Sequence, residues 1–190
     1  MFVLLLVTPA LAAPRCPAPD PLAPLDSDTA PDGAEYVLVA DDKLVCWWVV
    51  DELGDARIAK RWTRADRPPL RIEALADGRA VLVMNDLRLQ VRNVDDAHYR
   101  NLDVSVSGEP AVVLAHGTRD WVAITVPRDD EAVLVEVLDL DRERTLASVA
   151  LPAKDLALSF YGDGAVLWLD GAHSLALTEG GLTVREQSPR

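Results

Sequence analysis

The feature that most constrains this fold is a recurring pair of short apolar runs joined by a tight polar turn. The turns of these pairs are Asp41-Asp42, Asp77-Gly78, His116–Asp120 and Asp163-Gly164. Asp-Gly between apolar runs is a strong β-hairpin signal, because both residues tolerate positive φ. The intervals are 36, 39 and 47 residues, measured at Asp42, Gly78, Gly117 and Gly164. The spacing therefore predicts a β-structure that repeats about every 41 residues.

Short alternating runs rich in β-branched residues continue to the end of the chain, separated by Asp, Gly and Pro. Such runs are typical of strands, and no segment has a convincing apolar stripe of helical period. The best candidate for a helix, 131–147, contains alternating valines and is also expected to be a strand. The fifteen expected strands are 36–40, 44–50, 56–62, 70–76, 79–84, 87–92, 102–107, 110–115, 121–126, 132–138, 145–151, 155–160, 165–169, 173–177 and 181–186.

A unit of about 40 residues with about four short antiparallel strands is typical of a propeller blade. In Val135–Val149 an alternating strand, an Asp turn and a following Leu resemble the third-to-fourth strand junction of a WD40-like β-propeller blade. The stretch from Trp47 to Trp62 is a looser copy. The resemblance implies an all-β domain over 35–187 with about four propeller-like blades of four strands. A β-sandwich or irregular barrel is the alternative.

The number of units does not decide how they assemble. Propellers have about four to eight blades, so four units can close only as the smallest ring. Units that do not close expose a sheet edge that can pair with a second copy of the chain. The third option is that the chain is a piece of a larger propeller.

The N-terminal segment predicts export. Residues 1–12 are apolar and end in small residues, which is typical of a secretory signal peptide. Residues 13–34 are rich in Pro and Asp and are expected to form an arm outside the fold. In a periplasmic or extracellular compartment the two cysteines, Cys16 and Cys46, would pair as a disulfide. The alternative is a mobile Cys16 and a Cys46 buried as a small apolar side chain.

Two adjacent tryptophans, Trp47 and Trp48, fall within one expected strand. Neighbouring residues of a strand face opposite sides of the sheet. In a propeller, neighbouring blades cover both of these faces. In a sandwich one of the two rings would be exposed and would be a candidate contact residue.

Charge narrows the possible partners. The chain has 31 acidic and 19 basic residues and a formal net charge of −12. Nucleic acids and anionic membrane surfaces are therefore not expected as partners. No segment is long and apolar enough to predict a membrane span. The remaining classes of partner are another protein and a small surface ligand.

Motifs for catalysis and cofactors are not found. The sequence has no Gly-x-Ser-x-Gly, no phosphate-binding glycine loop and no metal-ligand spacing, so we assign no catalytic residue, metal or cofactor. The best candidate for ligand binding is the turn with His116, Arg119 and Asp120, although a solvent-exposed turn histidine is the simpler interpretation. The sequence thus predicts an exported, non-enzymatic binding or scaffold module. The alternatives are an enzyme or accessory subunit with a site at a propeller channel, and a fragment of a larger propeller.

Overall fold

The computed structural model describes residues 15–19, 24–95, 98–128, 132–151, 158–161, 166–168, 173–178 and 181–186. Within this part the chain forms sixteen strands, one 3-10 turn (η1, Arg64–Asp66) and no α-helix. The strands are β1 (Asp26–Thr29), β2 (Glu35–Ala40), β3 (Leu44–Val50), β4 (Ala56–Thr63), β5 (Pro69–Ala74), β6 (Ala80–Met84), β7 (Arg88–Arg92), β8 (Tyr99–Ser105), β9 (Val112–Ala115), β10 (Trp121–Pro127), β11 (Val133–Asp139), β12 (Arg144–Leu151), β13 (Ser159–Tyr161), β14 (Val166–Trp168), β15 (His173–Thr178) and β16 (Gly181–Glu186). The all-β prediction is confirmed. The expected signal peptide lies outside the described residues.

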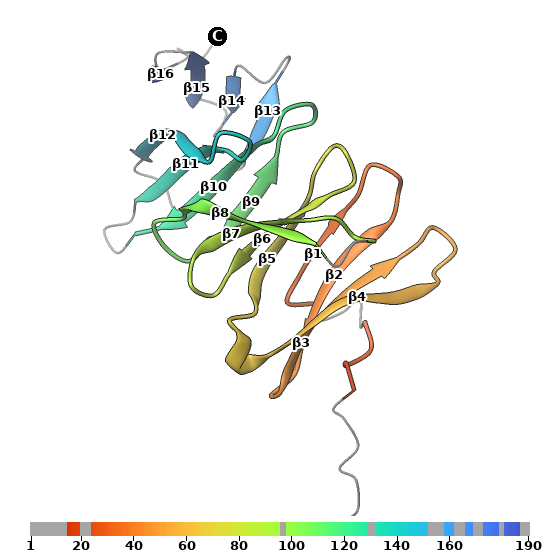
Figure 1. The fold of residues 1–190 in the computed structure, drawn as a ribbon. Coiled ribbons are helices and arrows are strands. Elements are labelled where there is room, and N and C mark those ends of the chain that lie inside the picture. The colour runs from red at the N-terminus through yellow and green to blue at the C-terminus, as the bar shows by residue number, and fades with distance from the viewer. Residues whose placement is uncertain are drawn as a thin grey trace, which may run out of the picture.

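Each sheet consists of four consecutive antiparallel strands in chain order, so the chain forms four sheets one after another (Figure 1). The first strands of successive sheets lie next to one another, β1 beside β5 and β5 beside β9. The last strands of the second, third and fourth sheets are also neighbours, with β12 beside β8 and β16. The first and fourth sheets lie at opposite ends of the molecule (Figure 1). The predicted propeller-like blades are confirmed, and they form an open row.

The cores lie between successive sheets. The first core joins sheets one and two and contains Trp47 and Leu82, and the second joins sheets two and three and contains Val81 and Ile124. The third core extends from the third sheet to Phe160 on the fourth. All five residues of β6 are buried, because alternate side chains enter the first and the second core. A strand covered on both faces has a continuous apolar run, as this one does.

Three hairpins have the same type of turn, which contains a glycine in the left-handed conformation. The φ angles of Gly33, Gly54 and Gly78 are 86°, 85° and 81°. The amide of each glycine donates to the carbonyl three residues earlier, at 2.9 Å. This is a type I turn followed by a glycine bulge. In the Asp32-Gly33 and Asp77-Gly78 pairs only the glycine has a positive φ.

The first sheet begins earlier than the sequence analysis expects. Strand β1 lies in the segment 13–34 that was predicted to be an arm, and it pairs with β2. We missed it because Asp-Ser-Asp-Thr contains no apolar residue. Its turn to β2 contains Gly33, which matches Gly78 in the second sheet, 45 residues later. The turn at Asp41-Asp42 instead joins the second and third strands, so the predicted repeat started one hairpin late.

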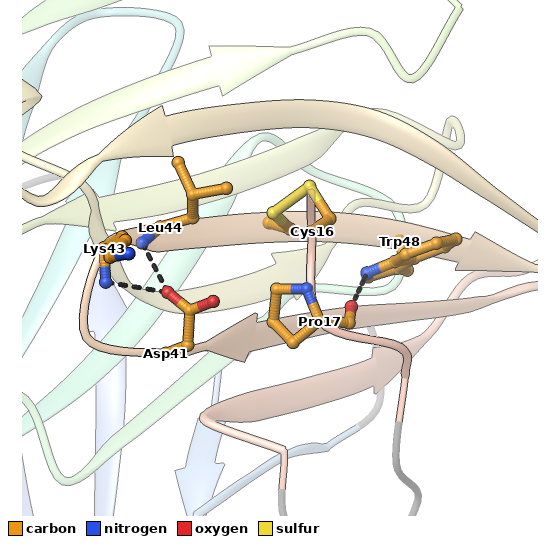
Figure 2. The surroundings of a disulfide bond; sticks show 7 residues. Cys16, Pro17, Asp41, Lys43, Leu44 and Trp48 are labelled. Carbon is orange, nitrogen blue, oxygen red and sulfur yellow. Dashed lines mark hydrogen bonds between the residues drawn. A yellow bond between two sulfur atoms is a disulfide. The ribbon is translucent and has the colours of Figure 1, made fainter. Parts of the chain in front are cut away.

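A disulfide attaches the N-terminal strap, residues 15–19, to the first sheet, and the predicted pairing of Cys16 with Cys46 is confirmed (Figure 2). The Trp48 indole also donates to the carbonyl oxygen of Pro17 at 3.0 Å. Cys46 and Trp48 lie on the face of β3 opposite to Trp47, away from the second sheet. The strap therefore covers a face of the first sheet that lies outside the cores formed by the described sheets.

Replacing Gly78 with alanine tests the turn. A Cβ at Gly78 would meet no atom within 4 Å, so the expected loss comes from backbone strain alone. We expect Gly78→Ala to lower the free energy of unfolding by about 1–2 kcal/mol, because an L residue is strained at positive φ. Gly117→Ala is the matched control, since Gly117 also has open space but no positive φ. Urea denaturation that shows equal losses for both variants would contradict this account.

Candidate functional site

His116 lies in the turn between β9 and β10 and is 3% exposed. Its Nδ1 accepts hydrogen bonds from the amides of Thr118 at 2.9 Å and Arg119 at 3.1 Å. Its ring packs against Trp121 and against Phe160 of the fourth sheet, with centroids 5.8 Å and 4.8 Å apart. The interpretation as a solvent-exposed turn histidine is therefore wrong. His116 shapes its turn and packs between the third and fourth sheets.

The other two predicted site residues, Arg119 and Asp120, also make contacts within the protein. The Arg119 guanidinium lies over the Trp121 ring, 4.4 Å from its centroid. Asp120 Oδ1 accepts a hydrogen bond from Arg79 at 2.8 Å, which ties this turn to the β5–β6 turn of the second sheet. The structure thus places all three predicted residues in one turn, where His116 and Arg119 both contact the Trp121 ring and Asp120 pairs with Arg79. Ligand binding at this turn stays a prediction.

Carboxylates on the first strand of one sheet accept hydrogen bonds from backbone amides on the first strand of the next. The bonds run from Ile72 to Asp26 at 2.8 Å, from Ala74 to Asp28 at 2.7 Å and from Ala115 to Glu73 at 2.7 Å. They connect β1 to β5 and the end of β5 to the end of β9. Asp28, Glu73 and His116 border a common groove, but these acidic side chains already serve to hold the sheets together.

Glu73 has an unusual proton affinity. Burial raises the pKa of its carboxyl from 4.5 to about 8, the hydrogen bond from the Ala115 amide opposes this, and the charges of Asp28 and Asp26 add to it. Burial likewise raises the pKa of Asp26. A carboxyl whose pKa is higher in the folded protein stabilises the fold when protonated. That contribution is complete below about pH 4.5 and is lost as the pH rises toward 8.

We expect Glu73→Gln to remove this pH dependence. The amide oxygen can still accept the Ala115 hydrogen bond, but it needs no proton. As the pH rises from 5 to 8.5, the unfolding free energy of the variant should increase by about 2 kcal/mol relative to that of the unchanged protein. The half-buried carboxyl keeps some solvation, and this limits the size of the effect. Urea denaturation across this pH range measures the difference. A difference between the two proteins that is the same at every pH would contradict the assignment.

A cleft of about 400 Å³ lies between the outer strands of the first and second sheets. Its lining comes from β4, η1 and the residue after it, β6, the turn between β6 and β7, β7 and β8. The lining residues are Lys60, Arg61, Trp62, Asp66, Arg67, Met84, Asp86, Arg88, Gln90, Arg92, Tyr99 and Asn101. We call this the cation cleft, because five of its residues are basic and two are acidic. Its positive charge is notable in a chain of net charge −12.

The two acidic residues of the cation cleft have partners. Asp66 accepts hydrogen bonds from the backbone amide and the hydroxyl of Thr63, at 3.1 and 2.7 Å. These bonds lower the pKa of the Asp66 carboxyl. Asp86 pairs with Arg67 at 2.9 Å and lies 3.9 Å from Arg88.

Three basic residues of the cation cleft, Lys60, Arg61 and Arg92, have no carboxylate partner within the described part of the chain. Lys60 and Arg61 are exposed, whereas Arg92 is buried. The cleft can therefore attract and pair with negative charge from outside the chain.

Other kinds of site are not evident among the described residues. They contain no group of three or more His, Cys, Asp or Glu side chains placed to hold a metal ion. The same residues include no helix with the length and apolarity needed to cross a lipid bilayer.

The cation cleft is not predicted from the sequence. Its parts lie on six segments of two sheets, and no single segment contains more than two of its five basic residues. The one available signal was the concentration of arginine between residues 57 and 92 in an otherwise acidic chain.

No protein-family model matches the chain, and no curated protein matches it either. Solved structures do match. TolB from Acinetobacter baumannii has a TM-score of 0.53 at 12% identity, over 84% of this chain and 40% of TolB. A 6-phosphogluconolactonase-like protein from Bacteroides uniformis has a TM-score of 0.52 at 10% identity, over 85% of this chain and 52% of that protein. The chain thus spans about half or less of the length of these neighbours.

These similarities concern the fold. At 10 to 12% identity they show a propeller-like arrangement of four-stranded sheets, in agreement with the sheet order described above. They do not identify the chain as a WD40-like propeller, so the WD40 resemblance stays a prediction.

Proposed function

We propose that the protein is an exported, non-enzymatic binding module whose negatively charged ligand enters the cation cleft. The observation that carries the proposal is the excess of positive charge in this cleft of an acidic protein. Walls of one sign of charge concentrate ligands of the opposite sign and speed their association. The disulfide supports export, because such bonds persist in oxidising compartments.

The test compares binding of poly-glutamate and poly-lysine by biolayer interferometry at low and high salt. We expect poly-glutamate to bind despite the negative net charge of the protein, and to bind more weakly as salt rises. The double variant Lys60→Glu/Arg61→Glu should weaken binding at least tenfold, since both residues line the cleft, are exposed and have no carboxylate partner among the described residues.

The control variant changes the net charge by the same amount, but outside the cation cleft. Arg128→Glu/Arg144→Glu alters two exposed residues of the third sheet that do not line the cation cleft. It should leave most of the affinity intact. If the two double variants lose affinity equally, binding reflects net charge and the cleft is not the site. Binding of poly-lysine alone would also overturn the proposal.

A further inference from the structure

Arg92, at the end of β7, is held between aromatic rings from two sheets. It is 4% exposed. Its guanidinium carbon lies 4.2 Å from the centroid of Tyr99 on β8 and 5.6 Å from that of Trp62 on β4. A guanidinium stacks well on aromatic faces, so the rings fix its plane.

A hydrogen-bond chain fixes the direction of the same group. Arg92 Nε donates to Gln90 Oε1 at 3.2 Å, and Gln90 Nε2 donates to Asn101 Oδ1 at 2.7 Å. The two terminal nitrogens of Arg92 have no partner within the described residues, yet they are not sealed from solvent. Because Arg92 lines the cation cleft, these nitrogens are available to a molecule that enters it.

Such an arrangement is unfavourable for the stability of the protein when no ligand is bound. Burial lowers the pKa of Arg92, but an arginine stays protonated in proteins. A buried charge without an opposite charge destabilises a protein, whereas the same charge with a well-placed partner does not. The carboxylates of the cleft are engaged with Thr63 and with Arg67, so they do not supply that partner.

We propose that Arg92 binds, through its two terminal nitrogens, an oxyanion group of a small ligand in the cation cleft. This inference rests on the proposed function and deepens it by naming the ligand chemistry. The planar guanidinium matches a carboxylate or a phosphate in a two-point interaction. The volume of about 400 Å³ suits a ligand of small-molecule size. Lys60 and Arg61 attract the ligand from the exposed rim, and Arg92 fixes its orientation.

Calorimetry with three matched probes tests the inference. Benzoate carries a carboxylate, phenyl phosphate carries a phosphate, and benzamide is the neutral counterpart of benzoate. We expect at least one oxyanion to bind and benzamide not to bind. The oxyanion that binds more tightly shows whether the ligand group is a carboxylate or a phosphate. Arg92→Lys keeps the charge but loses the two-point geometry, so it should weaken binding at least tenfold.

Arg100→Lys is the matched control. Arg100 is on β8, donates to the Leu140 carbonyl at 2.7 Å and does not line the cleft, so this variant should bind normally. If Arg92→Lys fails to fold, the guanidinium Nε–Hε signal of Arg92 in the unchanged protein serves instead. It should shift with the oxyanion and not with benzamide.

The outcomes separate this inference from the proposed function. If poly-glutamate binds at the cleft but no small oxyanion does, the inference is overturned and the proposed function stands. If the small oxyanion binds through Arg92 but poly-glutamate does not bind, both stand, and the cleft takes a small oxyanion and not an acidic polymer. If neither binds, both the proposed function and the inference fail. Equal affinity of Arg92→Lys and the unchanged protein for the oxyanion overturns the inference.

Discussion

Cys16→Ala/Cys46→Ala is expected to lower the free energy of unfolding by about 3–4 kcal/mol. The disulfide closes an interval of 30 residues and restricts the unfolded chain. Its loss also frees the N-terminal strap from the face of the first sheet where Cys46 is fully buried. Urea denaturation of the double variant and the unchanged protein measures the effect.

Reduction provides the control for the same prediction. A dithiol reductant should lower the stability of the unchanged protein to that of the double variant, and it should leave the double variant unaffected. The indole of Trp48, which donates to Pro17, should become more exposed and shift its fluorescence to longer wavelength. Identical urea midpoints with and without the disulfide would refute the structural role of the strap.

Trp47→Ala should destabilise the protein by about 3–5 kcal/mol, as large-to-small changes in a core do. Trp47 is 1% exposed and lies in the first core, with its ring edge-on to Tyr36 at 5.4 Å. Removal would leave a cavity between the first and second sheets. Thermal and urea denaturation, with near-ultraviolet circular dichroism to follow the core, measure the loss.

Trp48→Ala is the comparison, because it removes the same side chain from the opposite face of the same strand. Trp48 is half-buried against the strap, so the loss should be about 1–2 kcal/mol. Trp47→Phe should also lose less than Trp47→Ala, since Trp47 Nε1 has no hydrogen-bond partner among the described residues. Equal losses for Trp47→Ala and Trp48→Ala would contradict the placement of the two rings.

The turn residues show why the sequence analysis found the sheets but misjudged their start. Asp77-Gly78 lies between apolar runs and is visible as a hairpin, whereas Asp32-Gly33 follows the polar strand β1 and is not. The carboxylates that make β1 polar are the ones that accept hydrogen bonds from β5. A strand held by its side chains to a distant strand therefore lacks the apolar pattern from which strands are predicted.

The predicted and the observed candidate sites differ for a similar reason. His116 stood out because a histidine followed by Arg and Asp in a turn resembles a binding cluster, yet its partners are the backbone and two aromatic rings. Arg92 ends a strand of alternating residues and resembles any surface arginine. Its significance depends on Trp62, which is 30 residues away in the chain and in another sheet.

The sequence by itself determined most of the hairpins, the four-strand units and which two cysteines can form a disulfide. Hairpins depend on turn chemistry and on alternation within a few neighbouring residues, and the two cysteines allow only one pairing. The tertiary structure decided what depends on distant segments coming together: the open row of sheets, the covering of the first sheet by the strap and the cation cleft. Burial and charge pairing arise only when sheets pack, so a single strand cannot show that Arg92 is buried without a carboxylate partner in the described part of the chain.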